Sequence, residues 1–198
     1  MKCCLLISLV FFIIVVNSGT RINLLLPQLP LGKYRLNFIS IIPRCISIQS
    51  KNKILFDLYL SKKSAIIAEI KGNITNLIPV DDSLNLEFNL AIKDSTGDWK
   101  ENAHVHKSTK SCSSLKMFFG NAWTPIMDNL GFLNATCPIP AGFYKMKGVD
   151  SELFNISNFP KTFFYGTYRF RFYYTKNNEV YGCFMIVIEI KRPWETDN

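Results

Sequence analysis

Two histidines separated by one residue are the clearest candidates for metal or acid–base chemistry in this sequence. His104 and His106 would share one face of a strand, and Asp98 precedes them closely. A catalytic zinc ion usually has three protein ligands, but the chain has no third histidine and no H-E-x-x-H motif. We therefore interpret the pair as surface histidines and expect no metal site.

Other catalytic motifs are also missing from the sequence. It contains no G-x-S-x-G nucleophile elbow and no glycine-rich phosphate loop. Its cysteines are better explained by disulfides than by a nucleophilic thiol. We predict a protein that is not an enzyme and needs no cofactor. An enzyme built on His104 and His106 is the weakest alternative.

The first residues have the three-part pattern of a secretory signal peptide. Lys2 gives a basic start, residues 5–16 form an almost unbroken apolar run, and small or polar residues follow through Gly19. We predict cleavage after Ser18, with Gly19 as the second choice, so that residues 19–198 form one secreted, extracellular domain. A single-pass anchor is the alternative, but the run is shorter than the roughly 20 residues that span a bilayer.

Secretion makes the cysteines interpretable, because disulfides persist in oxidising compartments. Cys3 and Cys4 would leave with the signal peptide. Four cysteines would remain: Cys45, Cys112, Cys137 and Cys183. They predict two disulfides, with three possible pairings. Zinc is the rival interpretation, but no close C-x-x-C pair is present.

Three N-glycosylation sequons agree with the same compartment. They begin at Asn73, Asn134 and Asn155. We expect these asparagines at exposed positions, with at least one of them glycosylated.

Arginines alternate with aromatic residues over residues 168–174, a pattern superficially similar to an RNA-binding strand. A simpler interpretation is a strand whose aromatic side chains face the core while Arg169 and Arg171 face water. A secreted protein seldom meets RNA, so we expect no nucleic-acid partner.

The elements that position these residues are mostly strands. With 48% hydrophobic, 14% aromatic and 19% charged residues, the chain cannot be disordered, collagen-like or a coiled coil. Apolar residues recur at every second position, or continuously, in segments 34–38, 54–60, 84–92, 168–174 and 180–191. Shorter strands are expected over 65–71, 74–78 and 143–149, with turns at Gly72, at 94–97 and at Asn177-Asn178.

One segment has helical rather than strand periodicity. Between residues 113 and 130, apolar side chains recur at spacings of three and four. Pro125 lies inside this stripe and should interrupt it, because proline cannot donate a helix-interior hydrogen bond. We therefore predict one helix of two or three turns followed by a shorter one.

The C-terminal half resembles the ML lipid-recognition family. The stretch Thr136-Cys-Pro-Ile-Pro-Ala-Gly-Phe-Tyr144 is similar to that family's CP-x-P-x-G-x-Y motif. Residues 166–172 and 181–188 resemble its closing hairpin, which carries the family's last cysteine. The resemblance extends from about Cys112 to Trp194. It is strongest to the ganglioside activator branch and its secreted arthropod relatives, some of them chemosensory.

This resemblance implies a mainly β fold, an immunoglobulin-like β-sandwich or cup with an apolar cavity and one short helical loop at its mouth. It also implies the disulfide pairing. The family's first cysteine bridges to its last, which matches Cys45 with Cys183. In the activator branch another bridge spans the helical loop, which matches Cys112 with Cys137.

We therefore expect a secreted protein that holds a lipid or another hydrophobic small molecule between two sheets. The cavity and its rim should be lined by Phe118, Phe119, Trp123, Ile126, Met127, Leu130, Phe88, Phe170 and Phe172. The formal net charge of +8 would favour transient contact with an anionic membrane surface, and a receptor is another possible partner. The alternative is a secreted protein-interaction module, such as a co-receptor or salivary effector, with a filled core and no ligand.

Overall fold

The computed structural model describes residues 30–43, 45, 51–64, 67–132 and 134–195. The predicted signal peptide, residues 1–18, lies outside the described residues, as do residues 19–29 at the start of the predicted domain.

The protein is mainly β and forms a β-sandwich, which confirms the predicted fold class. One sheet has five antiparallel strands in the order β2 (Arg35–Ile42), β11 (Glu179–Lys191), β10 (Gly166–Lys176), β5 (Asn85–Lys93) and β6 (Trp99–Ser108). The other contains β3 (Ile54–Lys62), β4 (Ala68–Asn76) and β7 (Gly142–Lys145), with the short β8 (Val149–Asp150) also paired to β4. A small ribbon joins β1 (Leu31–Gly32) to β9 (Phe163–Phe164).

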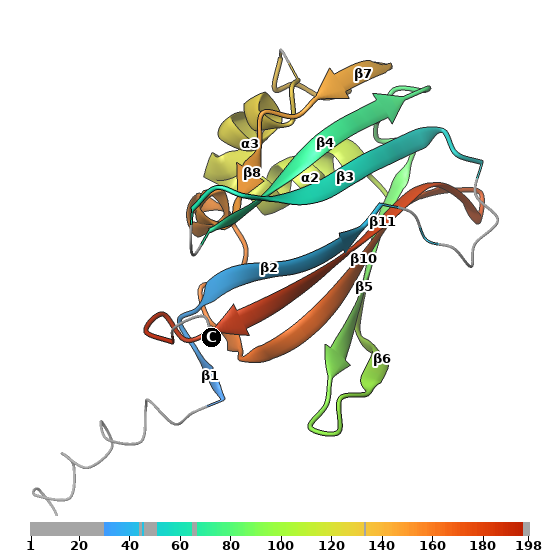
Figure 1. Cartoon of the computed structure of the whole chain (residues 1–198). Helices are drawn as coiled ribbons and strands as arrows, with labels where there is room; N and C mark the ends of the chain where they lie inside the picture. The colour runs from blue at the N-terminus through green and yellow to red at the C-terminus, as the bar shows by residue number, and fades with distance from the viewer. Residues whose placement is uncertain (1–29, 44, 46–50, 65–66, 133, 196–198) are drawn as a thin grey trace, which may run out of the picture.

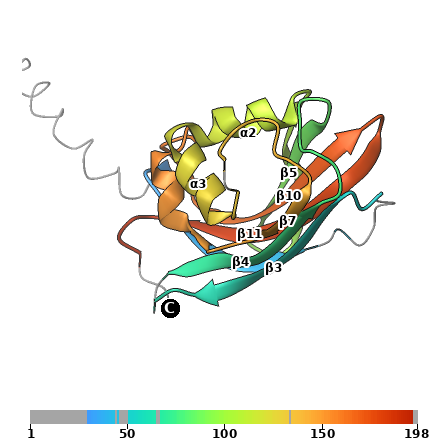
Figure 2. The same ribbon diagram turned by 90° about the horizontal axis from the view of Figure 1, so that it is seen from above.

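The two sheets meet along one side and helices cover the other. β3 packs against both β2 and β11, whereas α2 (Ser111–Phe119) packs against β5. Figure 1 shows β3 and β4 above β2, and Figure 2 shows α2 and α3 (Trp123–Asn129) on the side opposite β3. The helical segment therefore closes the side of the sandwich on which β5 lies.

The long C-terminal hairpin forms as the alternating pattern predicts. Lys176 is paired with Glu179, and the two residues between them, Asn177 and Asn178, both have positive φ. Asparagine tolerates this left-handed conformation, which a tight two-residue hairpin turn requires. The turn prediction at these asparagines is confirmed.

The turn predicted at Gly72 is wrong. β4 runs without interruption through this glycine, so the two short strands expected over 65–71 and 74–78 are one strand. Gly72 has φ +132°, and a Cβ atom there would lie 1.9 Å from the carbonyl oxygen of Asp57. Glycine is therefore needed for the close approach of β3 to β4, not for a turn.

The helical stripe forms two helices, as predicted, but proline is not what separates them. α2 ends at Phe119, and its C-cap residue Gly120 begins a short 3-10 turn, η4 (Gly120–Ala122), before α3 starts. Gly120 has φ +51°, a backbone conformation that glycine adopts readily and other residues rarely do. Pro125 instead lies in the first turn of α3, where the missing N–H has no helical partner to lose.

Both predicted disulfides are present. Cys45 is bonded to Cys183 across 138 residues of sequence, and Cys112 to Cys137 across 25. The first bond links the chain after β2 to the neighbouring strand β11, and the second links the start of α2 to the segment before β7. Two disulfides are compatible with an extracellular protein.

Most of the buried apolar residues belong to two clusters, which half-buried side chains connect. The larger cluster joins β3 and β4 to both helices and includes Phe56, Ile74, Trp123 and Ile126. The smaller cluster lies on the inner face of β2, β10 and β11 and is made of Phe38, Tyr168, Ile186, Ile188 and Ile190. Half-buried apolar side chains pack against both clusters, among them Ile41, Ile70 and Phe154.

Candidate functional site

Four phenylalanines on the inner face of the five-stranded sheet stay only half-buried. We call Phe88, Phe170, Phe172 and Phe184 the inter-sheet aromatic surface. They share this face with buried neighbours, since Leu86 and Leu90 flank Phe88 along β5 and Ile186 follows Phe184 on β11. In a filled sandwich, inward side chains interdigitate and lose nearly all contact with solvent.

Ring contacts hold this surface in one arrangement. Phe172 stacks on Phe184 with ring centres 4.8 Å apart, and its edge meets Phe88 at 5.6 Å. Phe170 stacks on Phe172 at 6.3 Å. These distances are typical of favourable aromatic pairs, so the inter-sheet aromatic surface is ordered. We call this surface, together with the rings that continue it, the aromatic wall.

The wall continues into the helical segment. Phe118, near the end of α2, meets Phe88 edge-on at 5.1 Å and stacks on Phe159 at 6.0 Å. Phe119 in turn contacts both Phe159 and Phe154 at 6.2 Å. An unbroken series of rings thus connects the inner face of β5 with the 3-10 helix η5 (Ser151–Ile156) and the residues that follow it.

The predicted cavity residues separate into two groups. Trp123, Ile126 and Met127 of α3 are almost fully buried in the larger core, where the indole N–H of Trp123 donates to the carbonyl oxygen of Ala135 at 2.7 Å. The others are half-buried: Phe118, Phe119, Leu130, Phe88, Phe170 and Phe172. The α3 residues therefore belong to the packed core, the phenylalanines of the second group belong to the aromatic wall, and Leu130 packs at the edge of the larger core. Lining of a ligand cavity stays a prediction.

A small pocket opens beside this wall and was not foreseen from the sequence. It has a volume of about 50 Å³ and is lined by Tyr34, Leu36, Phe154, Asn155, Phe159, Pro160 and Lys161. The hydroxyl of Tyr34 donates to the carbonyl oxygen of Pro160 at 2.7 Å, which fixes one side. Its residues come from β2 and from the region of η5, neither of which has a distinctive motif.

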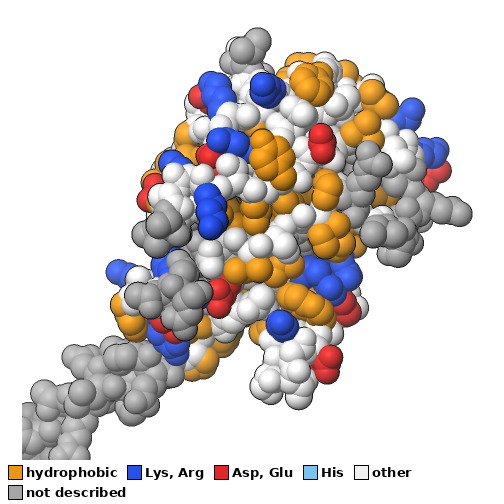
Figure 3. All heavy atoms as spheres, viewed as in Figure 1, with side chains coloured by type: hydrophobic (Ala, Val, Ile, Leu, Met, Phe, Trp, Pro, Cys, Tyr) orange, Lys and Arg blue, Asp and Glu red, His pale blue; other side chains and the backbone are white. Residues whose placement is uncertain are grey.

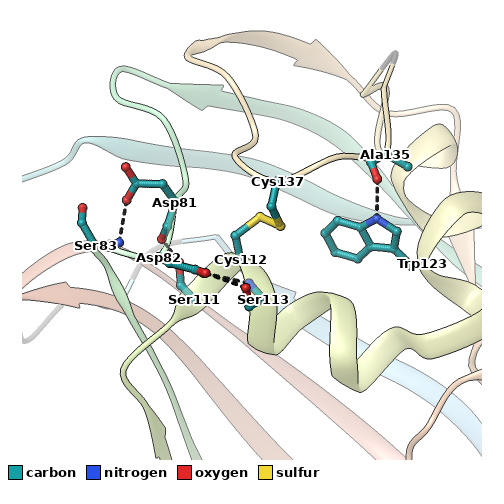
Figure 4. Close-up of a disulfide and its surroundings, with 9 residues drawn as sticks. All are labelled: Asp81, Asp82, Ser83, Ser111, Cys112, Ser113, Trp123, Ala135 and Cys137. Atoms are coloured by element: carbon teal, nitrogen blue, oxygen red, sulfur yellow. Dashed lines mark hydrogen bonds between the residues drawn. A yellow bond between two sulfur atoms is a disulfide. The ribbon is translucent and has the colours of Figure 1, made fainter.

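α2 is held in place at its first residues by groups outside the helix. The side chain of its N-cap residue, Lys110, makes no capping hydrogen bond to the helix. Asp82, from the connection between β4 and β5, makes such a bond in its place. The Asp82 carboxylate accepts from the backbone N–H of Ser113 at 2.9 Å and from its hydroxyl at 2.5 Å. Figure 4 shows these bonds beside the Cys112–Cys137 disulfide.

This capping predicts a pH-dependent contribution to stability. The Ser113 hydroxyl and backbone N–H hold the pKa of Asp82 below its ordinary value. A carboxyl group with a lowered folded-state pKa stabilises the protein above its unfolded pKa, about 4, and loses that stabilisation as pH falls through the folded value.

We expect Asp82→Ala to lower the free energy of unfolding by about 1 kcal/mol at pH 7, as other lost helix caps do. The difference between wild type and Asp82→Ala should shrink below about pH 4. Urea unfolding followed by circular dichroism at several pH values measures it. A difference that stayed constant down to acid pH would show that the carboxylate charge has no part in capping α2.

The histidine pair does not form a metal site in the described part of the chain, where no group of three or more His, Cys, Asp or Glu side chains could hold an ion. His104 is exposed, whereas the ring of His106 stacks on Phe88 with centres 4.9 Å apart. His106 is therefore a polar member of the aromatic wall.

The arginines of β10 face away from the aromatic wall. Arg169 and Arg171 both pair with Glu101 of β6, and the Arg169 guanidinium lies 4.6 Å from the ring centre of Trp99. These contacts occupy the guanidinium groups on the outer face. The arginine–aromatic stripe thus has a structural explanation within the sheet.

The three sequons lie in different surroundings. Asn134 and Asn155 are exposed, and Asn155 belongs to η5 beside the small pocket. Asn73 is half-buried on the outer face of β4, between Asp57 of β3 and Lys145 of β7. Glycosylation stays a prediction, which mass mapping of glycosidase-treated peptides from the secreted protein tests.

The outer face of the smaller sheet also carries apolar side chains. Tyr59 is 56% exposed and Phe143 66% exposed. Figure 3 shows the hydrophobic side chains on this side of the molecule interspersed with lysines and arginines. This is a mixed surface and does not form a continuous apolar patch.

The chain matches no model of a known protein family and no curated protein sequence. Within the described residues, none of the helices has the length and apolar character needed to cross a membrane.

Proposed function

We propose that this protein is a secreted, non-enzymatic lipid-binding protein with an ML-like sandwich. The observation that carries the proposal is the inter-sheet aromatic surface, whose rings face inward and are nevertheless only half-buried. Phe184 packs against the larger buried cluster and Phe170 and Phe172 against the smaller one, yet each ring keeps part of its apolar surface uncovered. A lipid or lipid-like semiochemical between the layers would complete the burial of these rings.

Solubilisation is the mechanism we propose. An acyl chain gains about 0.8 kcal/mol for each methylene removed from water, so binding requires that many methylenes are covered by the two layers. The rings of Phe88, Phe172 and Phe184 provide an apolar wall. The protein would carry its ligand through an aqueous compartment for transfer or chemosensory presentation.

We also propose that the end of α2 and the η5 region form the rim through which a ligand passes. Asn158 joins them, because its side-chain amide donates to the carbonyl oxygen of Met117 at 2.7 Å and its backbone N–H to that of Phe118 at 3.0 Å. Met117 is 60% exposed and Ile156 52% exposed. Exposed lysines accompany these apolar side chains, at positions 116 and 161.

An apolar rim with lysines suits an anionic membrane surface, where each basic residue near the surface contributes about 1 kcal/mol. Co-sedimentation with phosphatidylcholine vesicles, with and without phosphatidylserine, tests this contact. We expect more binding with phosphatidylserine and a loss in Met117→Asp. Equal binding to both vesicle types would contradict an electrostatic contribution.

Binding of lipid between the sheets predicts a difference between the two faces of β10. Phe172 faces inward and its neighbour Tyr173 outward. Phe172→Ala should weaken lipid binding about tenfold or more, because one ring of the wall is lost, and Tyr173→Ala should leave it unchanged. Displacement of a fluorescent fatty acid measures both variants, and thermal unfolding confirms that they are folded. Equal affinities for the two folded variants would place the ligand elsewhere.

A secreted protein-interaction module is the second candidate function. It is favoured by the exposed Tyr59 and Phe143 on the outer face of the smaller sheet. If the secreted protein carried no lipid and protein atoms covered its inner aromatic rings, the protein-interaction function would be supported. Lipid that can be extracted from the protein would support the lipid-binding function.

A further inference from the structure

Asn76 is a buried amide that has no hydrogen-bond partner among the described residues. It is 3% exposed at the end of β4, and neither its side-chain nitrogen nor its side-chain oxygen is paired with any of those residues. An asparagine amide has two N–H donors and one acceptor oxygen. Burying such a group unpaired is unfavourable, and nearly all buried polar side chains in proteins find a partner.

The strand register directs this amide into the sandwich. Asn76 and the buried Ile74 share one face of β4, while Thr75 between them faces outward. Across the strands, Asn76 is opposite the buried Ile54 on β3 and Gly142 on β7. One register partner is aliphatic and the other has no side chain, so neither supplies a polar group.

We propose that Asn76 binds the polar end of the ligand, which is therefore an amphiphile and not a pure hydrocarbon. This inference rests on the proposed lipid-binding function. The group that complements an amide is neutral and carries both a donor and an acceptor, as a hydroxyl or a ligand amide does. A charged headgroup would need a counter-charge, which the register partners Ile54 and Gly142 do not supply.

Two ligands that differ only in a hydroxyl test this role. Hexadecan-1-ol and hexadecane are each used to displace a bound fluorescent probe, N-phenyl-1-naphthylamine, from wild type and from Asn76→Leu. We expect Asn76→Leu to weaken the binding of hexadecan-1-ol about tenfold, equivalent to about 1.4 kcal/mol. The affinity for hexadecane should stay unchanged. The thermal midpoint of ligand-free Asn76→Leu should not fall, since leucine removes an unpaired amide.

Asn89→Leu is the matched control, because Asn89 lies on the outer face of β5 opposite Arg171. It should change the affinity for neither ligand. If Asn76→Leu lowered the affinity for both ligands equally, Asn76 would affect only the packing of the interior, and the inference would be overturned. Unchanged affinities together with a lower thermal midpoint of Asn76→Leu would also overturn it. In that case the amide stabilises the ligand-free protein by pairing with a structural water. Probe binding that neither ligand displaces from wild type would overturn the proposed function, and this inference with it.

Discussion

Replacing Cys45 and Cys183 together by serine is expected to lower the free energy of unfolding by about 4–5 kcal/mol. The bond closes a loop with a sequence separation of 138 residues, so its loss frees a large amount of conformational entropy in the unfolded chain. The thermal midpoint should fall by roughly 10–20 °C for a domain of this size.

The second disulfide provides the internal comparison. Cys112 and Cys137 close only 25 residues, so the corresponding double serine variant should lose about 3.5 kcal/mol. Urea unfolding of both variants under the same conditions measures the difference. A larger loss for the Cys112/Cys137 variant would show that local strain or packing, not loop length, decides how each disulfide contributes.

Trp123→Ala is the second substitution with a large expected effect, a loss of about 3–5 kcal/mol. The helical stripe, together with the resemblance to the ML family, predicts Trp123 at a cavity rim, where truncation would cost less than in a packed core. In the structure it is 3% exposed in the larger core, stacks near Phe119 at 6.3 Å, and bonds to Ala135. Removal of its side chain would leave a cavity and an unpaired carbonyl oxygen.

Two further tryptophan variants separate these contributions. Trp123→Phe keeps an aromatic ring but loses the 2.7 Å hydrogen bond, and should cost about 1–2 kcal/mol. Trp194→Ala, at a position 63% exposed, should change the stability by less than about 0.5 kcal/mol. Chemical unfolding of the three variants gives the comparison. If Trp123→Ala cost no more than Trp194→Ala, the packing of α3 described here would be wrong.

The strands could be predicted because their signals are local: alternation over residues 84–92 and 168–174 gives β5 and β10 directly. Four cysteines predict two disulfides but leave three pairings open, and the pairing was implied by the resemblance to the ML family. β6 gave no such signal, because its residues are polar and mostly exposed at an edge of the sheet. Gly72 was misread for a physical reason as well, since glycine serves both turns and close strand contacts.

The candidate site was only partly predictable. Helical periodicity identifies which residues of the α2–α3 segment are apolar, but not whether they fill the core, as Ile126 does, or remain half-buried, as Phe118 does. That distinction depends on the neighbouring layers. The stacking of His106 on Phe88 and the unpaired amide of Asn76 depend on strand register, which a single sequence does not determine.

Native mass spectrometry of the secreted protein, followed by lipid extraction, tests whether the protein binds lipid. We expect a folded protein that carries a bound hydrophobic molecule, released on denaturation and recovered in the organic phase. The Phe172→Ala variant should carry less of it than wild type, and Tyr173→Ala the same amount. A folded wild-type protein that has only the mass of its own chain and glycans, and takes up no added lipid, would contradict the proposed lipid binding.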